Sequence, residues 1–319
     1  MASKKIITVV GATGNQGAGV LSVVIGNPEY HVRALTRHSD SCTARELSAK
    51  GVEVVAADID DVESLKAAFS GSHIIYAITN FFEPFAKFGA EKAAEIETQQ
   101  GVNLARAASA TPTLQHYIWS TLPDIVAISG GKYAVPHYVA KNKVDAFIRL
   151  DAGLLKKTTL LWITWYHSNY KAPPFTPYFI PTAHKYVQFA DYSPATPIST
   201  IGDVRSNVGP FVEAILANPA RTRNGAVVKA EIEDPTAGEL LQRWGKATGN
   251  DVVFVRTDAE TFNGLWPILT EELGEILFWD EFRDKSWTVA DGTVLTKEDL
   301  GVDTSKFVPL EESLKTLKL

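Results

Sequence analysis

Residues 6–17 read IITVVGATGNQG, and they decide the fold of this 319-residue chain. The β-branched run at 6–10 stops at a glycine, which is typical of a buried strand in a parallel sheet. The loop G-x-x-G-x-x-G follows at once, and apolar residues at 18–25 predict a helix behind it. A strand, a glycine turn and a helix in this order predict the phosphate-binding start of a dinucleotide-binding fold.

Each glycine of the loop has a physical role in that interpretation. Gly11 permits the tight turn, Gly14 lets the backbone approach a pyrophosphate, and Gly17 lets the helix pack closely on the strand. The helix N-terminus offers free N–H groups and a partial positive charge to phosphates. The predicted pyrophosphate contacts are Gly11, Thr13, Gly14, Asn15, Gln16 and Gly17. The alternative is a relict loop that has kept its glycines without the ligand.

A regular alternation of strands and helices extends from this loop to residue 120. Further strands are predicted at 31–36, 52–57, 73–78 and 116–120, with helices at 44–50, 62–69 and 87–108 between them. Five strands alternating with helices imply βαβ units. They predict an α/β fold, a doubly wound parallel sheet of the Rossmann type with right-handed crossovers.

The alternation becomes less regular after residue 120. We expect helices at 139–150, 203–218, 236–249 and 258–279 and from residue 310, and strands at 159–164, 226–230 and 252–255. Residues 171–200 are rich in Pro, Tyr and Phe, which suits a substrate-covering loop or hairpin rather than a helix. We therefore expect an NADP(H)-binding Rossmann domain at 1–155. Residues 156–319 would hold the remaining sheet strands and an interleaved, smaller substrate-binding region.

The end of the second predicted strand indicates which dinucleotide is bound. A carboxylate there would favour NAD through the ribose 2′-hydroxyl, whereas an arginine would meet the 2′-phosphate of NADP. The chain has Leu-Thr-Arg-His-Ser at 35–39 and no acidic residue between 30 and 39. Arg37 therefore favours NADP(H), with Thr36 and Ser39 as hydroxyl donors, and a solvated arginine is the alternative. The ends of the third and fourth strands place Asp58 and Ile59 at the adenine, and Thr79, Asn80 and Phe81 beneath the ribose and nicotinamide.

Composition and charge exclude several other classes of protein. The chain carries 31 Lys and Arg against 37 Asp and Glu, a net charge of −6, which argues against direct binding to nucleic acid or to anionic membranes. Its single cysteine, Cys42, excludes an intramolecular disulfide and a cysteine-based zinc site, and no other cluster has metal-ligand spacing. No apolar run reaches the length of a signal-peptide core or of a membrane span, so we expect a cytoplasmic protein.

Six motifs resemble the atypical short-chain dehydrogenase/reductases of the NmrA-like group, which are akin to the isoflavone-reductase-like enzymes. They are VVGATGNQGAGV at 9–20, ALTR at 34–37, AADIDD at 56–61, YIWSTL at 117–122, HYVAKNKVDAFIR at 137–149 and WYHSNY at 165–170. The resemblance covers most of residues 6–170 and is weaker beyond. These motifs are specific to the superfamily, but they separate enzymes poorly from regulators, and the NmrA-like group contains both.

The resemblance implies a catalytic set in which one conventional member is missing. Most enzymes of the superfamily use Tyr-x-x-x-Lys and a serine: the tyrosine is the general acid, the lysine lowers its pKa and holds the nicotinamide ribose, and the serine orients the carbonyl. Lys141 matches the lysine, and Ser120 or Thr121 matches the serine. His137 stands where the tyrosine would be. Tyr138 lies about 100° round the helix from that position and cannot simply substitute for it.

Two functions are compatible with this resemblance. In the first, Lys141 anchors the nicotinamide ribose and can donate a proton through water, while His137 acts as an acid or an orienting group. Tyr166 and the loop residues Phe175, Tyr178 and Phe179 would pack a flat substrate against the cofactor. The protein would then be an NADPH-dependent reductase of a small aromatic or conjugated carbonyl, enone or imine-like substrate.

In the second, the protein is a non-catalytic NADP(H)-binding redox sensor or transcriptional co-regulator, and its partner is another protein. The depth of the site discriminates between the two functions. A buried aromatic cavity above the nicotinamide would favour the reductase, and a shallow exposed one would favour the sensor.

Overall fold

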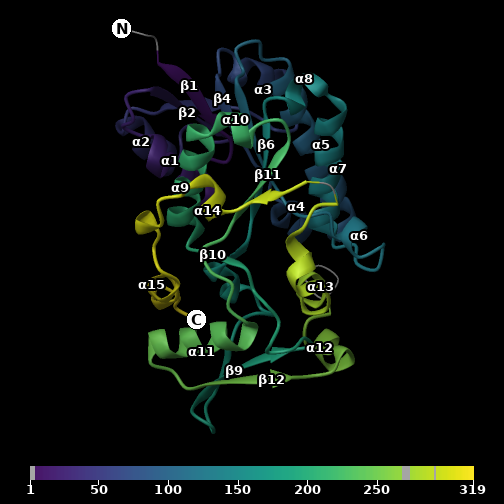
Figure 1. Ribbon diagram of the computed structural model, residues 1–319. Helices are drawn as coiled ribbons and strands as arrows, with labels where there is room; N and C mark the ends of the chain where they lie inside the picture. The colour runs from purple at the N-terminus through teal and green to yellow at the C-terminus, as the bar shows by residue number, and fades with distance from the viewer. Residues whose placement is uncertain (1–3, 268–273, 291) are drawn as a thin grey trace.

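A computed structural model describes residues 4–267, 274–290 and 292–319. The centre of the protein is an eight-stranded sheet whose neighbouring strands all pair in parallel (Figure 1). The strands are β1 (Lys5–Val9), β2 (Tyr30–Thr36), β3 (Glu53–Ala56), β4 (Ile74–Ala77), β5 (His116–Thr121), β6 (Thr158–Ile163), β11 (Ala226–Ala230) and β13 (Val294–Leu295). Their order is β13-β11-β6-β5-β4-β1-β2-β3. The chain runs outward from β1 to β3 and then returns to β4 on the other side of β1, which confirms the predicted doubly wound sheet.

Helices cover both faces of this sheet. Those of the first half are α1 (Asn15–Val24), α2 (Cys42–Ala49), α3 (Val62–Phe69), α4 (Phe82–Phe88), α5 (Ala90–Ser109), α6 (Ile125–Ile128), α7 (Pro136–Leu150) and α8 (Ala152–Leu155). Helix α1 packs against α9 (Val204–Ala217), and α5 packs against α7. Side chains of β1 such as Ile7 join one apolar core with α1 and α9, whereas Ile75 of β4 joins a second core with α5 and α7. The main sheet therefore separates two cores.

The helix predicted at 87–108 is two helices. Helix α4 ends at Phe88, and α5 begins at Ala90. Between them Gly89 has φ +77°, a conformation that glycine adopts without strain, and its N–H donates to the carbonyl of Phe85. This break separates α4, which follows β4 in the chain, from the longer helix α5.

The second half of the chain adds strands to the main sheet and builds a separate small one. In that sheet β8 (Tyr178–Ile180) and β9 (Lys185–Ala190) form an antiparallel hairpin, and β12 (Val252–Arg256) pairs with β9 in parallel. Two short strands, β7 (Trp165–Tyr166) and β10 (Thr200–Gly202), pair in parallel. In the sequence, β7 follows β6 of the main sheet and β10 follows β9 of the small sheet. Figure 1 shows β9 and β12 gathered with α11 (Ala237–Thr248) at the end of the molecule away from β1.

The remaining helices complete the C-terminal half. They are α10 (Pro219–Thr222), α12 (Ala259–Leu265), α13 (Gly274–Phe282), α14 (Lys297–Leu300) and α15 (Leu310–Lys315). Of the helix predicted at 258–279, α12 and α13 are described, and residues 268–273 lie outside the described part. Of the helices in the described ranges, none combines the length and the apolar character needed to cross a bilayer.

Candidate functional site

A cavity of about 900 Å³ opens along the carboxyl ends of the main strands, on both sides of the point where the strand order reverses. The glycine loop after β1 forms its floor, and residues at the ends of β2, β3, β4, β5 and β6 line it in turn. Ligands of open parallel α/β sheets bind in this position. The cavity is therefore the first candidate for a nucleotide site.

Nearly all of the site residues predicted from the sequence meet in this cavity. Those that line it are Gly11, Thr13, Gly14, Asn15, Gln16, Gly17, Arg37, Ile59, Thr79, Asn80, Phe81, Ser120, His137, Lys141 and Tyr166. Asp58 is the exception, because it does not line the cavity. Its carboxylate turns back to accept the N–H of Asp60, so Ile59 and Asp60 form the cavity wall at that point.

The glycine loop has the geometry that a bound pyrophosphate needs. Gly11 has φ +65°, and a Cβ on Gly17 would overlap the carbonyl oxygen of Gly11. Gly14 occupies the N-cap position of α1 and has no side chain with which to cap the helix, so the first N–H groups of α1 face the cavity without one. Asn15 accepts a hydrogen bond from Arg205 of α9 at 2.9 Å.

Arg37 lies at the predicted end of the cavity, but it is already paired. Its guanidinium donates to both carboxylate oxygens of Glu83, on α4, at 3.0 and 2.8 Å. These hydrogen bonds lower the pKa of Glu83 to about 2, and Lys87 adds a weaker contact at 3.4 Å. The Arg37 side chain is 58% exposed, so a phosphate could approach it, and Glu83 would then be a second anion on the same guanidinium. Thr36 lines the cavity as predicted, whereas Ser39 does not.

Lys141 is the centre of a buried polar cluster. From α7 its Nζ donates to Thr79 Oγ1 at 3.1 Å and to the carbonyl oxygen of Ser120 at 3.2 Å, and it lies 3.3 Å from Glu97 Oε1. Three oxygen partners match the three N–H groups of an ammonium. Nζ also lies 5.0 Å from the centre of the Trp119 ring, within cation–π range. The ammonium is therefore held in one place at the carboxyl ends of β4 and β5.

His137 is a neutral, largely apolar neighbour of that cluster. Burial, together with the nearby Lys141 ammonium, lowers the pKa of His137 to about 3. Its ring lies 5.6 Å from that of Phe81 and 5.7 Å from that of Phe82, and its Nδ1 finds no hydrogen-bond partner among the described residues. An imidazole in this state is neutral near pH 7 and keeps a single ring N–H, so His137 has no imidazolium proton to give as a general acid there.

The Tyr166 hydroxyl accepts a hydrogen bond from Gln16 and donates none to a described residue. The Tyr76 hydroxyl donates to Gln16 Oε1 at 2.7 Å, and Gln16 Nε2 donates to the Tyr166 hydroxyl oxygen. Because that oxygen accepts from Gln16, its own proton is available to another acceptor. Burial raises the pKa of Tyr166 to about 12, which keeps this proton in place near neutral pH. The Gln16 side chain, which the sequence predicted as a phosphate contact, thus hydrogen-bonds two tyrosine hydroxyls.

The aromatic walls of the cavity come from segments other than the predicted loop. Phe175 is buried against Trp165, Tyr178 stacks on Trp266, and Phe179 packs on Tyr186; none of these three loop residues lines the cavity, so that prediction was wrong. Residues 171–200 instead supply strands β8 and β9 of the small sheet. The aromatic residues that do line the cavity are Phe81, Phe82, Phe88, Tyr138, Trp165, Tyr166, Trp279 and Trp287.

Carboxylates of the site were missed in the sequence, among them Glu83 and Glu97. Glu83 has no local signal, because its partner Arg37 is distant in the chain. Glu97 has one: it falls between Ala93 and Gly101 at helical spacing, on the buried small-residue face of α5. A carboxylate in such a stripe is rarely buried unless it is paired, so it indicates a functional or structural partner.

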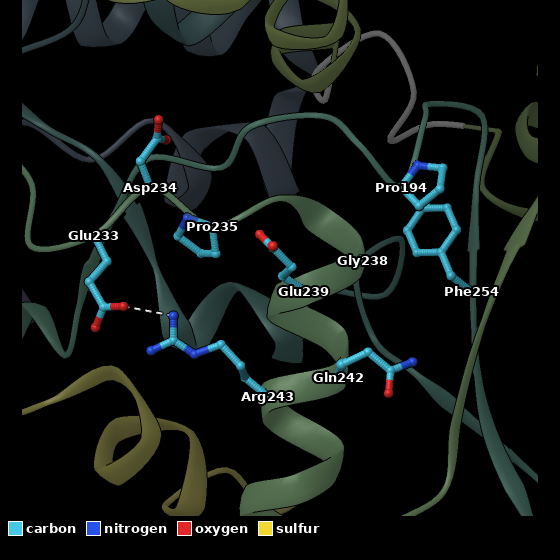
Figure 2. Close-up of a pocket in the computed structure, with 9 residues that line it drawn as sticks. All are labelled: Pro194, Glu233, Asp234, Pro235, Gly238, Glu239, Gln242, Arg243 and Phe254. Atoms are coloured by element: carbon cyan, nitrogen blue, oxygen red, sulfur yellow. Dashed lines mark hydrogen bonds and ion pairs between the residues drawn. The ribbon is translucent and has the colours of Figure 1, made fainter.

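A second, more open depression of about 810 Å³ lies at the start of α11 (Figure 2). Arg243 pairs there with Glu233, and Glu239 caps the helix by accepting the N–H of Thr236. None of its nine lining residues, all within the described part of the chain, has a buried polar atom without a partner. Its charges are satisfied internally, so it does not compete with the main cavity as a candidate site.

Comparison with known proteins places these features in a family. The family model described as NmrA-like family matches residues 3–295. The NmrA-like family domain-containing oxidoreductase hkm9 of Aspergillus hancockii is 29% identical over 272 residues, 82% of this chain and 78% of its own. The NmrA-like family domain-containing oxidoreductase FrzB of a Cladobotryum species is 30% identical over 254 residues, 76% of this chain and 74% of its own.

Solved structures show the same fold. The crystal structure of NmrA, a negative transcriptional regulator, aligns with a TM-score of 0.76 at 22% identity, covering 99% of this chain and 96% of that one. The same regulator has been crystallised with NAD and with NADP. The Citrobacter triphenylmethane reductase in complex with NADP(H) aligns with a TM-score of 0.67 at 17% identity, covering 97% of this chain and 98% of that one.

Proposed function

Because the chain belongs to the NmrA-like family, we propose that it is an NADP(H)-dependent reductase that acts by hydride transfer on a small aromatic or conjugated carbonyl, enone or imine-like substrate. One observation carries the proposal: a single cavity runs from the glycine loop to the aromatic walls, with the Lys141 cluster and the Tyr166 hydroxyl between them. A cavity with a phosphate-binding floor and an apolar far end suits a dinucleotide beside a flat organic substrate.

The residues present fit NADP(H). The pyrophosphate would lie on the N-terminus of α1, and the 2′-phosphate would meet Arg37, in place of Glu83. The second half of the dinucleotide would then extend toward Lys141, Thr79 and Ser120. The relatives named as oxidoreductases and the NADP(H) complexes of structural neighbours support this choice of cofactor. When bound, NADPH would supply the hydride.

The chain's own residues would supply the proton and the orientation. Tyr166 is our candidate donor, because its hydroxyl lines the cavity and Gln16 leaves its proton free. The substrate would accept the hydride at carbon and the Tyr166 proton at oxygen or nitrogen, or at carbon in an enone. Lys141 would hold Thr79 and Glu97 in place beside the cofactor ribose rather than donate the proton, since its three N–H groups are already directed at oxygens. His137 would serve as part of the apolar wall.

The test combines binding with turnover. Purified protein is titrated with NADPH, NADP+, NADH and NAD+, and NADPH consumption is then followed against aromatic ketones, enones and imines. We expect tight NADPH binding and turnover of at least one substrate class. Tyr166→Phe should lower kcat by about 10²-fold or more while the NADPH Kd stays within about twofold.

Tyr133→Phe is the matched control, because Tyr133 donates to Glu281 outside the cavity. Lys141→Ala should weaken NADPH binding. An unchanged kcat in Tyr166→Phe would reject Tyr166 as the donor, and tight NADPH binding without turnover of any class would count against the reductase.

A second function, a non-catalytic redox sensor with a protein partner, is favoured by one specific observation. The position of the conventional general acid holds His137, which is neutral near pH 7. The fold is also that of NmrA, a negative transcriptional regulator. A sensor should prefer the oxidised dinucleotide and consume no NADPH with any substrate, and this pattern in the same titration would replace the reductase by the sensor.

A further inference from the structure

Glu97 is the most deeply buried carboxylate of the cavity. It projects from α5 toward the ends of β4 and β5, and its side chain is 1% exposed. Its Oε1 accepts from the Thr79 hydroxyl at 2.7 Å and lies 3.3 Å from Lys141 Nζ. Thr79 in turn accepts from Lys141, so the three side chains form a closed triangle of hydrogen bonds and charge.

The other oxygen of the same carboxylate is left over from this triangle. Glu97 lines the cavity, and its Oε2 is buried without a hydrogen-bond partner among the described residues. A buried carboxylate oxygen that accepts nothing is unfavourable, and in native proteins such an atom usually has a ligand, an ion or a water as its partner. Because Lys141 and Thr79 are both directed at Oε1 and Glu97 lines the cavity, a group bound in the cavity beside this carboxylate is our candidate partner for Oε2.

The position of Glu97 along the cavity indicates which hydrogen-bond donor would reach Oε2. The glycine loop places the pyrophosphate at α1, and Arg37 marks the adenosine side beyond β2. Glu97 lies on the opposite side of the reversal point, with residues of β4 and β5, where the other half of a dinucleotide extends. The ribose of that half carries two hydroxyls, and a carboxylate accepts hydrogen bonds from hydroxyls strongly.

We propose that Glu97 is a cofactor-binding residue whose Oε2 accepts a hydrogen bond from a hydroxyl of the nicotinamide-side ribose, while its Oε1 holds Lys141 in position. This inference rests on the proposed function, because it requires a bound nicotinamide dinucleotide. It adds a negatively charged acceptor to the nicotinamide side of the site, where the residues predicted from the sequence are neutral or positively charged. In this arrangement Lys141 and Thr79 keep Oε1 occupied, so that Oε2 is the oxygen left to accept from a ribose hydroxyl.

The experiment measures binding, so it does not depend on finding the substrate. Dissociation constants of NADPH and of adenosine 2′,5′-bisphosphate are measured for the wild type and for Glu97→Gln. In the variant the single amide oxygen remains with Thr79 and Lys141, and the charged acceptor facing the cavity is lost. NADPH binding should weaken about tenfold, as expected for a lost hydrogen bond to a charged group. Adenosine 2′,5′-bisphosphate, which has no nicotinamide ribose, should bind within about twofold of the wild type.

Two controls separate this effect from a merely structural one. Glu95→Gln makes the same chemical change two residues away, on an exposed side chain paired with Lys92, and should leave both constants unchanged. An NADPH analogue without hydroxyls on the nicotinamide ribose should bind the wild type and Glu97→Gln equally, because the hydrogen bond is absent from both complexes.

Each outcome of the binding experiment with Glu97→Gln has its own interpretation. Equal weakening of NADPH and of the bisphosphate would overturn the inference and assign Glu97 a structural role. An unchanged NADPH constant in Glu97→Gln would overturn it too, and a raised KM for the organic substrate in that variant would assign Oε2 to the substrate instead. A folded wild-type protein that binds no NADPH would reject the proposed function itself, and the inference with it.

Discussion

At the scale of single residues, the pairing of Arg37 with Glu83 makes a prediction about cofactor preference. A 2′-phosphate that approaches Arg37 meets a competing carboxylate, because both terminal nitrogens of the guanidinium already donate to Glu83. Glu83→Gln removes that competitor and a negative charge beside the incoming phosphate. We expect NADPH to bind about three- to tenfold more tightly, consistent with the modest free energy of an exposed ion pair, while NADH binding changes little. Titration of both cofactors measures the ratio.

Matched variants keep this prediction specific. Glu63→Gln breaks another exposed ion pair, with Lys66, and should leave the NADPH to NADH ratio as it is. Arg37→Ala should lower NADPH affinity and spare NADH. If Glu83→Gln left the ratio at the wild-type value, Glu83 would not be competing with the 2′-phosphate.

Residue positions in the site were predictable where they depend on one strand end. Gly11, Arg37 and Lys141 follow from a loop, a strand terminus and a family motif, and all three line the cavity. The partners of Arg37 and Lys141 were not predictable. Glu83 and Glu97 reach them only because α4 and α5 fold back over the sheet, and such contacts depend on tertiary structure that local patterns do not encode.

At the scale of elements, helix α1 is positioned by its contact with α9, and this contact permits little change. A Cβ on Gly209 of α9 would lie 2.7 Å from the carbonyl oxygen of Gly19 and 2.7 Å from Val23 Cγ1. Gly209→Ala should therefore lower the free energy of unfolding by about 1–3 kcal/mol through overpacking, despite alanine's better helix propensity. Urea unfolding measures the change, and NADPH affinity should fall if α1 and its phosphate-binding end shift.

Gly264→Ala is the control for the propensity effect. A Cβ on Gly264, in α12, meets no atom within 4 Å, so that substitution should be neutral or stabilise by up to about 1 kcal/mol. Equal effects of the two substitutions would show that the α1–α9 contact can relax.

Elements with strong periodicity were predicted well, and the breaks between them were not. The strands of the first half appear within a few residues of their predicted bounds, because β-branched runs between turns specify them locally. The break at Gly89 was missed because a glycine inside a helical pattern is often tolerated. The two-residue strands β7 and β13 were missed as well, since a pairing that short has no periodic signal and depends on its neighbour in the sheet.

At the scale of the whole molecule, the parts of the chain before and after residue 155 share one sheet and one apolar core. Strands β6 and β11 come from the second part, and β6 pairs directly with β5 of the first. Helix α9, also from the second part, covers the face of α1. Residues of both parts thus share one apolar core, in which Val20 of α1 and Val208 of α9 are both fully buried. The aromatic walls formed by Trp165, Trp279 and Trp287 are likewise supplied by the second part, which supports its proposed role in substrate binding.

Because both parts of the chain contribute to the main sheet and to one apolar core, we predict that residues 1–155 alone do not fold to a stable unit. Without β6, the edge of β5 would be left open, and the apolar face of α1 would lie in water, both of which favour aggregation. We expect the isolated segment to be insoluble or to lack a cooperative unfolding transition. The full chain should unfold in urea with coincident transitions by far-UV circular dichroism and by tryptophan fluorescence. A soluble 1–155 segment that binds NADPH, or two separate transitions in the full chain, would mean that the Rossmann half stabilises itself and that α9 and β6 only dock onto it.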